Sequence, residues 1–184
     1  MLRHSEAVHL ADAERVTGVK DQLKRLKSTL LDSHHRYWHS SLWNDVGNPN
    51  GNKLRTYRLH KHHSTEPESY LRINLHRYER SALAKLRSGT LPLMIETGRY
   101  NGTPLVDRRC MCGIDVETEC HFLIDCDLHD RYRNILFEKC QNIFDNFIHE
   151  SSLVKYCLIL NEPTLQRTLA KTLVNMLANR HLYL

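Results

Sequence analysis

The chain contains 184 residues with a formal net charge of +5, and 41% of the residues are hydrophobic and 26% are charged. These proportions are ordinary for a soluble globular protein, and no run of about 18 apolar residues is present that would span a bilayer. The first residues also lack the apolar core of a secretory signal peptide. We therefore expect an intracellular protein, nuclear or cytoplasmic, with reduced cysteines and no membrane partner.

The first predicted element is a long amphipathic helix, from Val19 to about Leu42, in an N-terminal helical segment that spans residues 1–46. Its apolar residues recur at helical spacing, and the neighbouring basic residues lie mainly off that stripe. The sequence GNPNGN, residues 47–52, is a turn cluster and is the clearest linker in the chain. The stripe consists of Val19, Leu23, Leu26, Leu30 and Leu31.

Positive charge is concentrated in the next segment, a basic helical segment at residues 53–104, and in the residues just after it. Residues 53–109 contain 12 Lys+Arg and 5 Asp+Glu, whereas residues 110–184 contain 7 and 10. A basic block of this kind favours contact with nucleic-acid phosphates. The candidate nucleic-acid-binding residues are Lys53, Arg55, Arg58, Lys61, Arg77, Arg80, Lys85, Arg87, Arg99, Arg108 and Arg109.

Helical patterns in the basic segment are short and interrupted. The spacing predicts a short helix near residues 53–63, a second that begins near Tyr70 and runs to about Tyr78, and a third over Ser81–Arg87. Residues 91–104 are rich in Gly and Pro and are predicted to be a loop or an extended piece. Tyrosines interleaved with the basic residues either pack against the domain or stack on unpaired bases. They are Tyr57, Tyr70, Tyr78 and Tyr100.

Helical periodicity returns in the C-terminal segment, residues 131–184. Apolar residues spaced by three or four positions predict a helix of about 20 residues over 128–147. A last helix is predicted to begin after Pro163, with its apolar stripe on one face. The stripe of this last helix contains Leu165, Leu169, Leu173 and Met176. The whole pattern predicts a mainly α fold, a helical domain with one small insertion.

That insertion is the cysteine-rich stretch CMCGIDVETECHFLIDC, which lies in a zinc-knuckle-like segment at residues 105–130. Structural zinc takes four ligands, usually thiolates and imidazole nitrogens, arranged as a tetrahedron. Cys110 and Cys112 form a first pair, and His121 and Cys126 form a second pair that suits a turn running into a helix. Gly113 follows the first pair, where a backbone that wraps around an ion often needs a positive φ.

Other interpretations of the cysteines remain open at the sequence level. Cys120 and His129 are alternative ligands, although Cys120 adjoins His121 and adjacent residues rarely bind the same ion. The thiols could instead pack as small buried hydrophobes without metal, or form disulfides. Cys140 and Cys157 lie in apolar helical stretches and are predicted to be core thiols.

Four stretches of the chain resemble the C-terminal region of non-LTR retrotransposon reverse transcriptases. They are NKLRTYRLHK (52–61), YLRINLHRYERSALAKLRSGTLPLMIETGRYNG (70–102), RRCMCG (108–113) and VETECHFLIDCDLHDRYR (116–133). In that family the polymerase domain is followed by a helical region and a CCHC zinc-knuckle-like segment. The family's acidic motif corresponds here to Glu117, Glu119, His121, Phe122, Leu123 and Cys126. Relatives more often have two or three residues between the first two cysteines.

The resemblance implies that Cys110, Cys112, His121 and Cys126 hold zinc, and that the basic segment touches template RNA or target DNA. No paired carboxylates suited to a two-metal polymerase site are recognisable, and neither is a phosphate-binding glycine loop. We therefore expect no catalysis by this chain and no small-molecule substrate. The alternatives are a metal-free helical protein–protein interaction module, which self-associates or binds a partner through its helical stripes, and a decayed element fragment.

Overall fold

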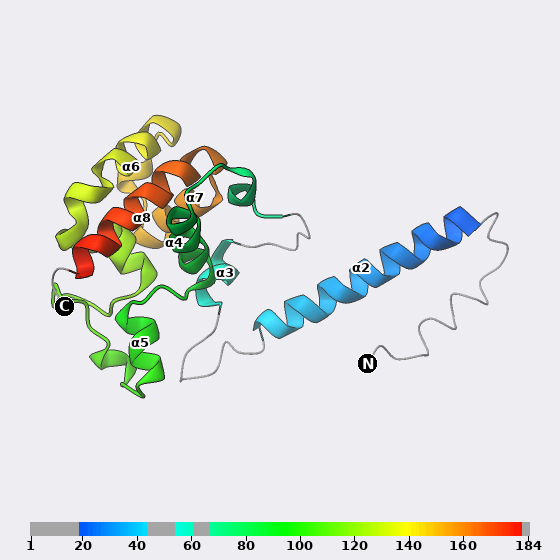
Figure 1. Ribbon diagram of the computed structural model, residues 1–184, viewed down its shortest axis with the longest axis horizontal. Coiled ribbons are helices and arrows are strands. Elements are labelled where there is room, and N and C mark those ends of the chain that lie inside the picture. The colour runs from blue at the N-terminus through cyan, green and yellow to red at the C-terminus, as the bar shows by residue number, and fades with distance from the viewer. Residues whose placement is uncertain (1–18, 44–53, 61–66, 182–184) are drawn as a thin grey trace. The chain divides into compact units, whose positions relative to one another are not determined.

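The computed structural model describes residues 19–43, 54–60 and 67–181. The chain divides into two units, Met1–Asn44 and Asp45–Leu184 (Figure 1). The described residues are mainly helical and form no β-strand, which confirms the predicted mainly α fold. Within these residues, no helix combines the length and the apolar character that crossing a membrane requires.

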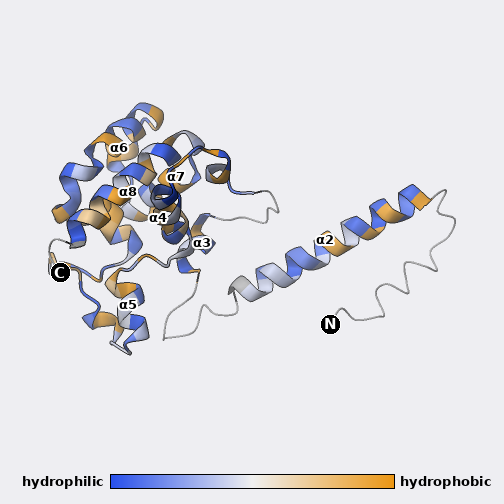
Figure 2. Ribbon diagram, viewed as in Figure 1, coloured by the Kyte–Doolittle hydropathy of each residue, from blue (hydrophilic) through white to orange (hydrophobic). Residues whose placement is uncertain are grey.

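The first unit contains the predicted amphipathic helix, α2 (Val19–Trp43). Hydrophobic and hydrophilic residues alternate along it, as Figure 2 shows. Its predicted apolar stripe is exposed, since Val19 is 71% exposed, Leu23 60% and Leu30 48%. In proteins, most of the stability of an amphipathic helix comes from the packing of its apolar face.

The first half of the second unit is built from short helices. They are α3 (Arg55–His60), η1 (Ser69–Arg72), α4 (Arg77–Ser88), α5 (Met94–Tyr100) and η2 (Leu105–Asp107). The helix predicted from Tyr70 to Tyr78 is wrong, because η1 is a single turn and the backbone is extended at Ile73. The next helix, α4, begins later, where the Glu79 carboxylate accepts the backbone N–H of His76 at 2.9 Å.

The loop predicted at residues 91–104 is also wrong, because it contains α5. The first N–H of this helix, on Met94, donates to a carboxylate oxygen of Glu117 at 2.6 Å. Gly98 lies inside α5 and allows close packing, since a Cβ there would lie 2.7 Å from the Arg108 side chain. The helix is therefore specified by contacts with residues outside the local sequence, which a periodicity argument does not detect.

The second half of the unit begins with the π-helical turn η3 (His121–Asp125) and the turn η4 (Asp127–His129). It continues with α6 (Asp130–Ile143), η5 (Phe147–His149), α7 (Ser152–Asn161), η6 (Pro163–Leu165) and α8 (Gln166–His181). The helix predicted over 128–147 is shorter than expected, because α6 ends at Ile143 and the backbone turns extended at Phe144. This bend lets the Phe144 and Phe137 rings pack on Phe147, with centroids 6.4 and 5.3 Å from it.

The last helix, α8, is the centre of the second unit and packs against both α4 and α6 (Figure 1). Its predicted apolar stripe is confirmed as core, because Leu165 is 1% exposed and Leu169, Leu173 and Met176 are fully buried. Burial of this stripe corrects the prediction that the C-terminal stripe mediates self-association. A stripe that lies in the domain's own core is not presented to a partner by the folded chain.

Replacing Leu169 by Ala is expected to lower the free energy of unfolding by about 2–5 kcal/mol, because it leaves a cavity in a closely packed core. Leu153, which is 51% exposed, provides the matched control. Leu153→Ala should cost less than about 1 kcal/mol. Urea unfolding followed by circular dichroism measures both variants, and equal losses would contradict the central position of α8.

Candidate metal centre

The first pair of candidate ligands lies on a tight turn. The Cys110 N–H donates to the Asp115 carbonyl at 2.8 Å, and the Gly113 N–H donates to the Cys110 carbonyl at 2.9 Å. An isolated β-bridge between Arg109 and Val116 holds the two arms of this hairpin together. Gly113 has a φ of 77°, which confirms the expected positive φ. The turn brings Cys110 and Cys112 to one side despite the single residue between them.

The second pair lies on η3, which follows the hairpin. The Thr118 hydroxyl accepts the His121 backbone N–H at 3.0 Å and so caps the start of this helical turn. The Cys126 N–H then donates to the His121 carbonyl at 2.8 Å, a π-type hydrogen bond across five residues. Residues five apart point in different directions on an α-helix, which turns every 3.6 residues. The wider π turn permits His121 and Cys126 to face the same point.

The two pairs converge on one position. The Sγ atoms of Cys110 and Cys126 are 3.5 Å apart, and Cys112 Sγ is 3.2 Å from His121 Nε2. All four ligand atoms lie within 4.8 Å of one another. A tetrahedral ion with ordinary metal–sulfur and metal–nitrogen bonds would separate its ligands by about 3.5–3.8 Å. The distances of 3.2 and 3.5 Å are close to these values, so the cluster could hold a metal ion through three sulfurs and one nitrogen.

Three of the four candidate ligands are buried, and the fourth is partly accessible to solvent. Cys110 and His121 are each 4% exposed, Cys126 is fully buried and Cys112 is half-buried. Burial raises the pKa of both the Cys110 and the Cys126 thiols, so both carry protons when no cation is bound. A bound cation would displace these protons, since thiolates are the ligands. Four protein ligands also fill a tetrahedral shell and leave no position for substrate, as in structural sites.

A buried arginine that the sequence analysis did not single out supports the second pair. Arg133, on α6, is 4% exposed and donates to the Cys126 carbonyl at 2.8 Å and to the Leu123 carbonyl at 3.3 Å. It also forms an ion pair with Asp130, one turn earlier on the same helix. These contacts satisfy the carbonyls at the end of η3, where the chain leaves the cluster. They thereby fix the direction in which Cys126 points.

Glu117, between the two ligand pairs, anchors the hairpin to the helical core. Its carboxylate accepts two hydrogen bonds from the Arg180 guanidinium of α8, at 2.7 and 2.9 Å, and it also accepts the Met94 N–H. Glu117 is 1% exposed and Arg180 is 6% exposed. Removal of either partner would leave a buried charge unpaired, so this bidentate pair ties α5, α8 and the candidate metal centre together.

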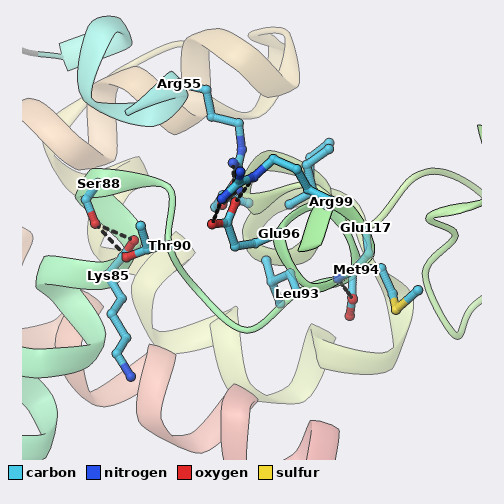
Figure 3. Close-up of polar contacts among 12 residues, drawn as sticks. Arg55, Lys85, Ser88, Thr90, Leu93, Met94, Glu96, Arg99 and Glu117 are labelled. Atoms are coloured by element: carbon cyan, nitrogen blue, oxygen red, sulfur yellow. Dashed lines mark hydrogen bonds and ion pairs between the residues drawn. The ribbon is translucent and has the colours of Figure 1, made fainter. Parts of the chain in front are cut away.

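The second acid of the motif, Glu119, belongs to a network that includes Glu96 and two arginines. Figure 3 shows Arg55 and Arg99 converging on Glu96; Arg55 Nη1 is 3.1 Å and Arg99 Nη2 is 2.7 Å from its carboxylate. Arg55 also donates to Glu119 through Nε at 3.1 Å. Burial alone would raise the pKa of Glu96, but hydrogen bonds from Arg99 and Arg55 hold it below its ordinary value. Burial keeps the pKa of Glu119 raised, although Arg55 opposes the effect.

The alternative ligands do not join the cluster. His129 is buried, with its ring against Phe122 at a centroid distance of 4.6 Å and its Nδ1 3.4 Å from Asn179 Nδ2. Burial lowers the pKa of His129 to about 4, so the ring is neutral. Burial also raises the pKa of Cys120 to about 12. Cys140 is fully buried as predicted, whereas Cys157 is only half-buried.

Several of the predicted nucleic-acid-binding residues are structural instead. Arg87 and Arg108 are buried and donate to backbone carbonyls, Arg87 to Leu160 at 2.7 Å and Arg108 to Thr103 at 2.9 Å. Both side chains lie in the interior of the unit, which corrects the prediction that they form part of an exposed basic surface. Arg55 and Arg99 are paired with buried carboxylates, as described above, and Arg80 donates to carbonyls of the segment before α4.

The other predicted basic residues differ in their accessibility. Arg77, Lys85 and Arg109 are exposed, and Arg58 is half-buried. The predictions at Lys53 and Lys61 lie outside the described residues. Exposed cations that the sequence analysis did not propose are Arg167 and Lys171 on α8. The sequence feature that could have indicated these cations is that the α8 segment contains basic residues and no acidic residue.

The second unit is thus a compact helical domain with a Cys/His cluster that could hold a metal ion. Comparisons with protein-family profiles, with curated proteins and with solved structures find no match to this chain.

Proposed function

We propose that this chain is a non-catalytic nucleic-acid-binding module organised by zinc, related to the C-terminal region of non-LTR retrotransposon reverse transcriptases. The observation that carries the proposal is the convergence of Cys110, Cys112, His121 and Cys126 within 4.8 Å. The resemblance described in the sequence analysis implies the same four residues as zinc ligands, although relatives more often have two or three residues between the first two cysteines. Template RNA and target DNA are the partners that the resemblance implies.

Zinc is the metal that best suits this set of ligands. Thiolates favour soft or borderline cations, and three thiolates with one imidazole form a known class of structural zinc site. The ion would fix the hairpin against η3, while Glu117, Arg133 and their partners hold the surrounding backbone. Its role would be to organise the fold, because no ligand position remains for a substrate.

Charge supports nucleic acid as the partner. The chain has a formal net charge of +5, and exposed cations remain on α4, α8 and the hairpin after the structural arginines are set aside. Phosphate contacts supply most of the affinity in sequence-independent binding, and this affinity falls steeply with salt. The proposal therefore requires binding that weakens as salt rises.

The expected result is micromolar or weaker binding of purified protein to RNA and to DNA at physiological salt, with log Kd rising linearly with log salt concentration. Fluorescence anisotropy with labelled oligonucleotides over a range of salt concentrations measures both quantities. The control is the same titration with an anionic polymer of other chemistry, such as heparin, as competitor. Absence of binding at low salt would contradict the proposal.

A second function, a helical protein–protein interaction module, is favoured by exposed apolar surface. The stripe on α2 is exposed, and an open apolar groove of about 370 Å³ lies on the second unit. Its lining includes Phe144, Leu153, Val154 and Leu158. Concentration-dependent assembly in sedimentation velocity, together with no salt-sensitive affinity for RNA or DNA, would support this function over the first.

A further inference from the structure

Two packed helices, α4 and α8, present a solvent face that carries positive charge and no exposed acid. On α4 the exposed residues include Arg77, Ser81 and Lys85, which recur at intervals of four. On α8 the exposed positions Arg167 and Lys171 have the same spacing. The two helices pack directly against each other, and Arg87 of α4 donates to Gln166 at the start of α8 at 3.4 Å, so the end of α4 that carries Lys85 lies beside the end of α8 that carries Arg167. We call this surface the α4–α8 face.

The absence of negative charge on this face has a structural reason. The only acidic residue of α4, Glu79, is 6% exposed and turned inward to cap its own helix. The sequence of α8 contains no acidic residue. The cations on this face therefore lack carboxylate neighbours within their own helices. This distinguishes them from Arg55 and Arg99, whose charges are paired with buried carboxylates.

The neighbouring elements extend the same surface. In Figure 3 the Lys85 side chain extends from α4 toward the ribbon of α8. On the other side of α8, Lys139 of α6 donates to the Thr168 hydroxyl at 2.8 Å, which holds a further ammonium group at the edge of the helix. Glu138, which is exposed on α6 beside Lys139, is an acidic residue at the α6 edge of this surface.

An exposed aromatic ring lies on the same side of α4 as Lys85, because Tyr78 precedes Ser81 by three positions and Lys85 by seven. Tyr78 of α4 is 58% exposed, and the His76 ring stacks parallel to it with centroids 5.6 Å apart. A positively charged surface with an exposed ring is the combination by which proteins bind single strands, because phosphates follow the cations and unpaired bases stack on the ring. By contrast, Tyr70 is 8% exposed and packs in the core.

We propose that the α4–α8 face binds single-stranded nucleic acid, with Lys85, Arg167 and Lys171 on the phosphates and Tyr78 against a base. This inference rests on the proposed function and assigns it a surface. The phosphate backbone and unpaired bases are common to RNA and DNA, so the face is not expected to distinguish them strongly. It lies on the helical core and uses none of the metal-ligating residues.

The test compares two variants that carry the same change in net charge. One is Lys85→Gln, Arg167→Gln, Lys171→Gln; the other is Lys20→Gln, Lys24→Gln, Lys27→Gln, which removes three exposed lysines of α2. Anisotropy with single-stranded RNA and DNA over a salt series gives the affinity and the salt slope. Loss of three phosphate contacts should reduce the magnitude of the slope by about 2 and weaken binding at least about tenfold at moderate salt. The α2 variant should retain the slope of the unaltered protein.

A second pair of variants tests the aromatic contact. Tyr78→Ala should weaken binding of single strands by about tenfold and leave duplex binding unchanged. Tyr100→Ala, at an exposed tyrosine on α5, should change neither. Equal losses for single strands and duplexes would overturn the stacking role of Tyr78.

The outcomes separate this inference from the function on which it rests. If the unaltered protein binds neither RNA nor DNA at low salt, the proposed function fails and the face fails with it. If the unaltered protein binds, but the α4–α8 variant keeps its slope while the α2 variant loses it, the inference is overturned and the proposed function stands. Circular dichroism and thermal unfolding of each variant establish that the folded structure is retained.

Discussion

Protein purified without added metal is expected to contain about one zinc ion per chain, and the double variant His121→Ala, Cys126→Ser is expected to contain none. Zinc binding to structural sites in finger peptides is worth about 10–16 kcal/mol at neutral pH. Loss of the ion should therefore lower Tm by at least about 10 °C, since about 3 kcal/mol suffices for that change in a domain of this size. Metal analysis by mass spectrometry and thermal unfolding by circular dichroism measure the two effects.

The expected loss extends beyond the hairpin because η3 is part of the core. Phe122 and Leu123 follow His121 directly and are fully buried in the cluster of apolar side chains that includes α8. If the ion no longer holds His121 and Cys126, both aromatic and aliphatic packing at this turn is weakened. The variant should therefore unfold less cooperatively as well as at lower temperature.

Cys157→Ser provides the matched control for the metal experiment. This thiol is half-buried on α7 and is not part of the cluster, so the variant should keep its zinc and nearly all of its stability. If the unaltered protein and the double variant both lack metal, and if all six thiols react alike with a thiol reagent, the cysteines are packing residues. The interaction-module function would then be favoured.

The clustering of the four candidate ligands could be predicted from the sequence because these residues are close together in the chain. Cys110 to Cys126 span one hairpin and one turn, so the number of arrangements is small. The geometry of the turns was not predictable. The single residue between Cys110 and Cys112 is accommodated by the turn at Gly113, whose φ is 77°. The π-helical form of η3 has no recognisable sequence signal.

The long helices were predictable for a related reason. In α2 and α8 the apolar residues follow the 3.6-residue period for several turns, which few alternative structures share. Short elements were predicted poorly, since α5 depends on a carboxylate of Glu117 that lies 23 residues from Met94. Side-chain periodicity carries no information about such partners.

The basic segment shows where composition was misleading. The positive charge of this segment predicts a surface that contacts phosphates, yet Arg87 and Arg108 are buried donors to backbone carbonyls. An arginine with several donors can satisfy carbonyls in the interior as well as phosphates at the surface. Only the fold separates these uses, because they require the same residue type at similar spacing.

Replacing Glu117 by Gln is expected to lower the free energy of unfolding by about 3–5 kcal/mol, because Arg180 would remain buried without its counter-charge. Glu117 also accepts the Met94 N–H that begins α5. Urea unfolding at neutral pH measures the change. Glu138→Gln, at an exposed acid of α6, is the control and should alter stability by no more than about 0.5 kcal/mol.

The double variant Glu117→Gln, Arg180→Met separates the charge pair from the rest of the site. Once both charges are removed, no unpaired ion is buried, so its loss of stability should be smaller than the sum of the two single losses by at least about 1 kcal/mol. Additive losses would show that the two side chains act independently and would contradict the bidentate pair. Zinc content measured on the same variants determines whether the pair also supports the metal centre. Because Glu117 lies between the two ligand pairs, we expect the single variant to retain zinc less tightly than Glu138→Gln does.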